Sequence, residues 1–108
     1  MKSATKFAIL LVTVPDAKTG RSLAKAALRA RLIACANLVP RIESFYWWQN
    51  RIEAGTEAIL FLKTSRAKVK SLENFILDQH PYDTPEVLAL PITSGTQRYL
   101  DWLNQSVS

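Results

Sequence analysis

The chain has 108 residues, of which 48% are hydrophobic, and its formal net charge is +5. This length and composition predict one domain over residues 1–108, with a core that needs no disulfide or structural metal. The single cysteine excludes an internal disulfide, and no apolar run approaches the roughly 20 residues that span a bilayer.

The first third of the chain reads as a strand followed by a helix. Residues 7–14 are a continuous apolar run rich in β-formers, which predicts a central strand. Asp16 is placed to cap a helix over residues 17–31. Gly20 weakens that helix by about 1 kcal/mol relative to Ala. The apolar stripe of the helix is expected to contain Leu23, Ala24, Ala27 and Leu28.

A long hairpin is expected next. Residues 32–48 read as extended, with a break at Pro40, and residues 52–63 read as the returning strand. Gln49, Asn50 and Arg51 form the predicted tight turn, because Asn tolerates the left-handed conformation that such turns often need. Both strands exceed the usual length of about 5–6 residues.

The second half repeats the strand and helix signals. Residues 65–79 predict an amphipathic helix, and residues 86–92 predict a strand whose Pro91 lies at an edge or bulge. The run Ser94-Gly95-Thr96-Gln97 matches a capping box before a short last helix. The resulting order, β-α-β-β-α-β plus a helix, predicts an α+β ferredoxin-like sandwich with an antiparallel sheet.

Aromatic residues at the far end of the hairpin predict an oligomer. Tyr46, Trp47 and Trp48 are consecutive, so they face both sides of the strand. A domain of this size cannot cover both faces with its own helices, and exposed aromatic clusters usually mark interfaces. The alternative is that these rings pack back on their own chain.

Several polar residues are candidates for a binding site at one sheet end or between subunits. Cys35 and Asn37 share a strand face, as do Glu57 and Lys63, because each pair has an even spacing. His80 and Tyr82 follow the second helix, and Tyr99 lies in the last one. Each residue also has a structural interpretation, such as a small core cysteine or an ion pair between Glu57 and Lys63.

Other chemistries match the sequence less well. One Cys and one His per chain are too few for a structural zinc site, and Cys35 with His80 has no readable nucleophile environment. The turn at Pro15 and Asp16 suits no phosphate, which disfavours an acylphosphatase-like hydrolase. The strand over residues 57–63 lacks the basic-Gly-aromatic signature of RNA-recognition modules. We therefore expect no nucleic-acid or membrane partner and a cytoplasmic location.

Short motifs are spread along nearly the whole chain. In order, they are Val12-Thr13-Val14-Pro15-Asp16, Arg31-Leu32-Ile33-Ala34-Cys35-Ala36-Asn37-Leu38-Val39-Pro40, Tyr46-Trp47-Trp48, Ile52-Glu53, Lys63-Thr64, His80-Pro81-Tyr82, Pro85-Glu86-Val87 and Tyr99-Leu100-Asp101-Trp102. Together these motifs resemble the CutA family of divalent-cation tolerance proteins. The resemblance implies a ferredoxin-like homotrimer held by its hairpins, similar in shape to PII-type signalling proteins. It also implies a role in tolerance of copper and other divalent metals, with no established reaction.

By position, the resemblance implies a ligand pocket for a small anion or a divalent cation. Its residues would be Cys35, Asn37, Trp48, Glu57, Lys63, Tyr82, Glu86 and Tyr99, with His80 and Cys35 as the metal ligands. Val12 and Gln79 replace a cysteine and a histidine that some bacterial members carry, so soft copper ligands are depleted. Direct copper or zinc binding, and a small hydrolase that uses Cys35 or His80, remain alternatives to a non-catalytic sensor.

Overall fold

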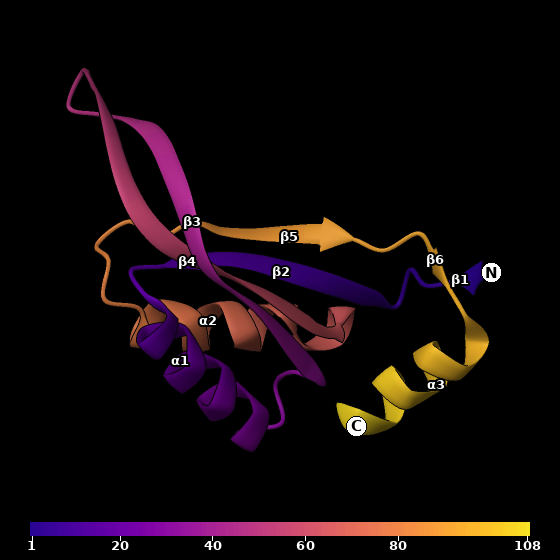
Figure 1. Ribbon diagram of the computed structural model, residues 1–108. Coiled ribbons are helices and arrows are strands. Elements are labelled where there is room, and N and C mark those ends of the chain that lie inside the picture. The colour runs from indigo at the N-terminus through magenta and orange to yellow at the C-terminus, as the bar shows by residue number, and fades with distance from the viewer.

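The computed structural model describes all residues, 1–108; its main antiparallel sheet has the helices α1 and α2 packed on one face, and β1 and β6 form a second, two-stranded sheet (Figure 1). The sheet has four strands in the order β3-β4-β2-β5, which is the ferredoxin-like arrangement that the sequence predicts. The elements are β1 (Lys2–Ser3), β2 (Phe7–Val14), α1 (Ala17–Arg29), β3 (Cys35–Trp48), β4 (Arg51–Ser65), α2 (Val69–Gln79), β5 (Val87–Pro91), β6 (Ser94–Gly95) and α3 (Gln97–Ser106).

The main core lies between the sheet and the helices α1 and α2. Strand β2 is hydrogen-bonded to β4 on one side and to β5 on the other, so its apolar run is central, as predicted. Alternate residues of β2 and β4 point to the helices and are almost fully buried against Leu72 and Ile76 of α2. The pleat thus gives one face of the sheet to the core.

Helix α1 begins where the sequence predicts but ends earlier. Asp16 caps it, with its Oδ1 accepting a hydrogen bond of 2.7 Å from the backbone N–H of Thr19. The helix ends at Arg29 because Arg31 has a left-handed φ of 60°, which produces a Schellman-type end. The predicted end at residue 31 and the predicted strand start at residue 32 are therefore wrong.

One further prediction for α1 needs correction, and the role of Gly20 needs an addition. Leu28 is 40% exposed, so it does not belong to the buried stripe. Gly20 is buried instead, where a Cβ would lie 3.0 Å from Leu38 Cδ1 and 3.3 Å from Val14 Cγ2. A glycine there lets the helix backbone approach the sheet closely, so this position is a packing contact as well as a cost in helix propensity.

The hairpin of β3 and β4 protrudes well beyond the rest of the molecule (Figure 1). Its turn has φ angles of 50° at Gln49 and 63° at Asn50, the pattern of a type I′ turn. The pairing shifts between Val39 and Ile42, around the predicted break at Pro40. The hairpin makes the chain 45 Å long and its radius of gyration 14.6 Å, whereas a compact domain of this length has about 13 Å.

The C-terminal third differs from the sequence prediction at two points. A short 3-10 helix (Arg66–Lys68) precedes α2, so the α-helix starts at Val69 and not at residue 65. The predicted capping box is wrong, because Ser94–Gly95 forms β6 and pairs with β1. Thr96 occupies the N-cap of α3 without a side-chain hydrogen bond. Leu100 and Leu103 of α3 then pack with Ala4 and Phe7 and form a second, small core.

The sheet face opposite α1 and α2 is open (Figure 1). The strand register places a band of apolar side chains on this open face, partly or largely exposed: Ile9, Leu11, Val39, Ile59, Phe61, Leu88 and Leu90. Only 22 of the 108 residues are buried, which reflects a sheet with one covered face. The isolated chain therefore leaves a large apolar surface in contact with solvent.

Candidate functional site

The structure divides the predicted site residues into two clusters. Cys35 is the register partner of Lys63, whereas Glu57 pairs with Ile42 on the far side of the bulge. Glu57 and Lys63 do share a strand face, but six residues of strand separate them by about 20 Å. A single chain therefore does not assemble the predicted residues into one pocket.

The first cluster, called the lysine cluster here, contains Cys35, Asn37, Lys63 and Tyr99. Lys63 Nζ donates a hydrogen bond of 3.3 Å to the Tyr99 hydroxyl and lies 5.5 Å from the centre of that ring. Cys35 Sγ lies 3.9 Å from Asn37 Oδ1, as a weak thiol hydrogen bond. Helix α3 supplies Tyr99, so the small second core positions this side chain above the strand end. The arrangement offers an ammonium, a hydroxyl and an amide to a ligand.

The second cluster, called the hairpin pocket, lies between the hairpin and the loop that follows α2. Its volume is about 650 Å³, and its lining comprises Thr13, Tyr46, Trp48, Glu57, Pro81, Tyr82, Asp83, Thr84 and Glu86. The Tyr82 hydroxyl donates a hydrogen bond of 2.8 Å to Glu57 Oε2. Burial of the Tyr82 hydroxyl, together with its hydrogen bond to Glu57, raises the pKa of Tyr82. Burial and the hydrogen bond both favour the neutral phenol of Tyr82, which remains a hydrogen-bond donor.

His80 lies behind this pocket and holds its loop against the sheet. The ring is buried, and its Nε2 lies 2.7 Å from the Thr13 carbonyl oxygen, so this nitrogen carries the proton and donates. Nδ1 accepts a hydrogen bond of 3.1 Å from the backbone N–H of Tyr82, and the two rings lie 4.8 Å apart. Both ring nitrogens of His80 are thus occupied by protein groups.

The residues of one chain do not assemble a metal centre. No three His, Cys, Asp or Glu side chains are close enough together to surround an ion. His80 and Cys35, the two predicted metal ligands, belong to the two different sheet ends described above. A metal site that uses them would have to draw ligands from another subunit.

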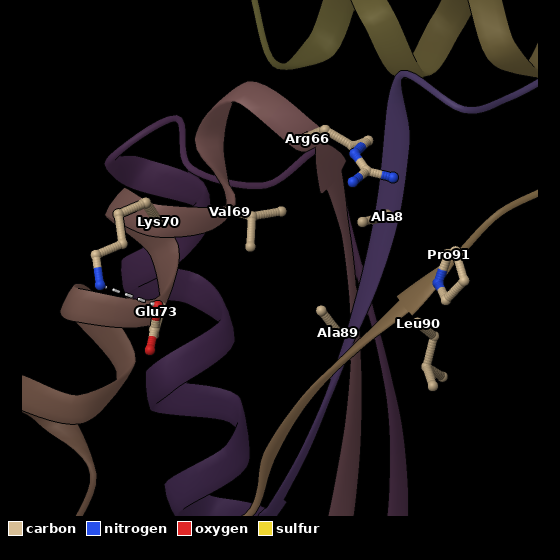
Figure 2. Close-up of a pocket in the computed structure, with 8 residues that line it drawn as sticks. All are labelled: Ala8, Arg66, Val69, Lys70, Glu73, Ala89, Leu90 and Pro91. Carbon is tan, nitrogen blue, oxygen red and sulfur yellow. Dashed lines mark hydrogen bonds and ion pairs between the residues drawn. The ribbon is translucent and has the colours of Figure 1, made fainter.

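A further pocket, which the sequence did not indicate, lies between α2 and the edge strand β5 (Figure 2). Its volume is about 510 Å³, and its lining is Ala8, Arg66, Val69, Lys70, Glu73, Ala89, Leu90 and Pro91. Lys70 and Glu73 form an exposed ion pair of 3.4 Å across its rim. None of the predicted site residues lies in this pocket, and an exposed pair of this kind contributes little stability.

Sequence reasoning missed several residues of the hairpin pocket. Tyr46 was predicted as an interface aromatic only, although its spacing of two from Trp48 places both rings on one face. Asp83 and Thr84 were not singled out, because the path of their loop depends on the His80 hydrogen bonds. The signal that could have identified Asp83 is its position between Tyr82 and Glu86, which were already candidates.

Comparison with known proteins gives the family. Residues 8–106 match the sequence family described as CutA1 divalent ion tolerance protein. The chain belongs to this family. It is 40% identical over 98 residues to the divalent-cation tolerance protein CutA of Thermus thermophilus, covering 91% of this chain and 95% of that protein. It is also 41% identical over 98 residues to the chloroplastic protein CutA of Arabidopsis thaliana, covering 91% of this chain.

Solved structures of CutA1 family members have the same fold. The structure of CutA from Synechococcus elongatus matches with a TM-score of 0.94 and 35% identity, covering 98% of this chain and 94% of that one. CutA1 from Ehrlichia chaffeensis matches with a TM-score of 0.92 and 31% identity, covering 98% and 99%. The ferredoxin-like fold, predicted from the order of the elements, and the resemblance to the CutA family are both confirmed.

The relatives differ in length and in named compartment. The chain spans about half the length of the Arabidopsis, rice and mouse proteins that it matches, at 54%, 55% and 53%. The Arabidopsis and rice relatives are named chloroplastic, and a matching structure from Archaeoglobus fulgidus is named periplasmic. No helix of this chain is both long and apolar enough to cross a membrane. The family name describes tolerance of divalent cations and not a chemical reaction.

Proposed function

We propose that this CutA1 family member is a non-catalytic homotrimer that contributes to tolerance of divalent cations, copper among them. It binds a small ligand or ion between its subunits, in the manner of PII-type sensors, and acts in the cytoplasm. The ligand pocket includes Cys35, Asn37, Trp48, Glu57, Lys63, Tyr82, Glu86 and Tyr99.

The observation that carries this proposal is the apolar surface that one chain leaves uncovered. Phe45, Trp47 and Ile52 at the hairpin end are 71%, 72% and 70% exposed, and they form a cross-strand patch. The open sheet face adds a second apolar region. Exposed patches of this kind mark interfaces, and copies of the same chain arranged in a ring can cover both regions.

Division of the site into two clusters also supports a ring of subunits. A cyclic assembly has head-to-tail interfaces, in which one end of a subunit meets the other end of the next. Such an interface can place the lysine cluster of one subunit beside the hairpin pocket of its neighbour. Lys63 then contacts an anionic group of the ligand, and Trp48 provides a stacking wall.

Sedimentation equilibrium at low micromolar concentration tests the assembly. We expect a particle of three times the 12.1 kDa chain mass. Trp47→Ser is expected to shift the equilibrium toward smaller species, because it removes an exposed apolar ring from the hairpin. The matched control is Trp102→Ser, which changes a 45% exposed tryptophan on α3. A folded monomer for the unmodified chain would refute the trimer.

Opposite charges at the two sheet ends allow a test of the shared pocket. A double-mutant cycle with Lys63→Gln and Glu57→Gln measures the coupling of the two side chains in trimer stability. Side chains that are about 20 Å apart within one chain should not couple, whereas neighbours across an interface couple by 0.5 kcal/mol or more. Zero coupling in an intact trimer would place the two clusters in separate sites.

A further inference from the structure

The hairpin pocket combines aromatic rings with carboxylates and contains no basic residue. Among its nine lining residues, three are aromatic (Tyr46, Trp48 and Tyr82) and three are acidic (Glu57, Asp83 and Glu86). This composition contrasts with the chain as a whole, whose net charge is +5. The pocket is therefore a local region of negative potential on a basic protein, and it disfavours the anionic group of a ligand, which the proposed function places at Lys63.

Tyr82, one of the three aromatic residues of the pocket, is held in place before any ligand binds. Tyr82 is fixed at three points, since its N–H donates to His80, its ring packs on the His80 ring and its hydroxyl donates to Glu57. His80 is itself anchored to the Thr13 carbonyl of β2. One carboxylate oxygen of Glu57 accepts the Tyr82 bond, which leaves Oε1 for a ligand. Preorganisation of this kind lowers the entropic cost of binding.

The chemistry of the lining distinguishes between two classes of cation. A divalent metal ion needs several oxygen, nitrogen or sulfur ligands around one point, and the carboxylates here do not converge in that way. An organic ammonium needs only aromatic faces within about 6 Å and a nearby negative charge. The volume of about 650 Å³ is also that of a small-molecule pocket and not of a single ion.

We propose that the hairpin pocket binds a small organic cation of the alkylammonium class. The ammonium group lies against the faces of Trp48 and Tyr46, and Glu57 and Glu86 balance its charge. This inference rests on the proposed function, because it names the ligand class of one half of that site. It assigns the tyrosine and tryptophan rings to recognition of charge, in addition to any contact that they make with a neighbouring subunit.

The test uses choline as the probe and a neutral molecule of the same shape, 3,3-dimethylbutan-1-ol, as its control. Titration of the ¹⁵N-labelled full chain follows the indole N–H signals of the three tryptophans. We expect a saturable shift of the Trp48 indole signal with choline and none with the neutral isostere. A response to both molecules alike, or to neither, would overturn the proposal, as would a response to Mg²⁺ alone.

Variants separate the charge from the aromatic wall. Glu57→Gln keeps an oxygen that accepts the Tyr82 hydrogen bond but removes the charge, so it should weaken choline binding several-fold. Trp48→Leu should weaken choline binding by roughly fivefold or more, the value of one partly desolvated cation–π contact. Trp102→Leu on α3 is the matched control and should have no effect. Unchanged affinity in both pocket variants would overturn the proposal.

Sedimentation of the same samples keeps this inference separate from the proposed function. A trimer that does not bind choline refutes the alkylammonium assignment and leaves the trimeric sensor standing. A folded monomer that binds choline refutes the trimer and leaves the pocket chemistry standing.

Discussion

His80 permits a direct test of whether a residue of this site is structural or binds metal. Its buried ring makes two hydrogen bonds, of 2.7 Å to the Thr13 carbonyl and 3.1 Å from the Tyr82 N–H. The pairing of β2 with β5 stops at Val12, so His80 contacts the strand just where its sheet partner ends. We predict that His80→Phe, which keeps an aromatic ring of similar volume, destabilises the protein substantially.

The magnitude follows from the two lost hydrogen bonds. Each is worth about 1 kcal/mol net, and leaving a buried partner unsatisfied adds to the cost. The Thr13 carbonyl and the Tyr82 N–H both lose their partner in His80→Phe, so we expect a loss of about 3 kcal/mol per chain. That is a large fraction of the 5–15 kcal/mol that holds a typical domain folded.

The assay is urea unfolding followed by circular dichroism, at one fixed protein concentration because the stability of the proposed trimer would depend on concentration. Gln79→Ala is the control, since the exposed Gln79 side chain bonds only the neighbouring Asp78. Calorimetric titration with Cu²⁺ under native conditions completes the test, and we expect the same binding isotherm for His80→Phe as for the unmodified chain. A variant with unchanged stability that lost copper binding would refute this account of His80.

Three smaller predictions follow from local contacts. Thr64→Val should lower the free energy of unfolding in urea by about 1–2 kcal/mol. The buried Thr64 hydroxyl donates a hydrogen bond of 2.6 Å to the Leu32 carbonyl, which valine would leave unsatisfied. Thr64→Ser keeps this hydroxyl and should lose much less stability. The hydrogen bond from the Thr19 N–H lowers the pKa of Asp16 from its usual value of 3.8. The ionised Asp16 therefore contributes fully to the stability of the fold above pH 3.8, and this contribution is lost as the pH falls through the lower pKa of the folded state. Acid unfolding of Asp16→Asn should lack this component. Gln49→Asn should raise stability by about 0.5 kcal/mol in the same urea assay, because Asn tolerates the φ of 50° better than Gln.

Local sequence patterns were enough to predict the three α-helices and the four strands of the main sheet. The apolar run over residues 7–14 gave β2 without error, and Asn50 gave the position of the turn. What the patterns did not provide was pairing over long sequence separation. Ser94 has the same local signature in a capping box and in β6, and only its partner Ser3, 91 positions away in sequence, decides between them. A two-residue bridge has too few side chains to signal this pairing in advance.

The candidate site was partly predictable for a related reason. Even spacing places Cys35 with Asn37, and Glu57 with Lys63, on a common face, because the side-chain period of a strand is two. Even spacing does not fix the distance along the strand, which here separates Glu57 from Lys63 by about 20 Å and divides the site. The contact between Tyr82 and Glu57 depends on the loop path after α2, which the His80 ring determines.

Two features of the sheet link these observations. Extension of β3 and β4 to 14 and 15 residues exposes Trp47 at the hairpin end, and the sheet face opposite α1 and α2 stays open as well. The stretch of β4 that pairs with β2 separates Lys63 from Glu57, so each cluster contains only part of the candidate site. The proposed ring of identical chains would resolve both at once, since the neighbour that covers the apolar surface could also bring the other cluster.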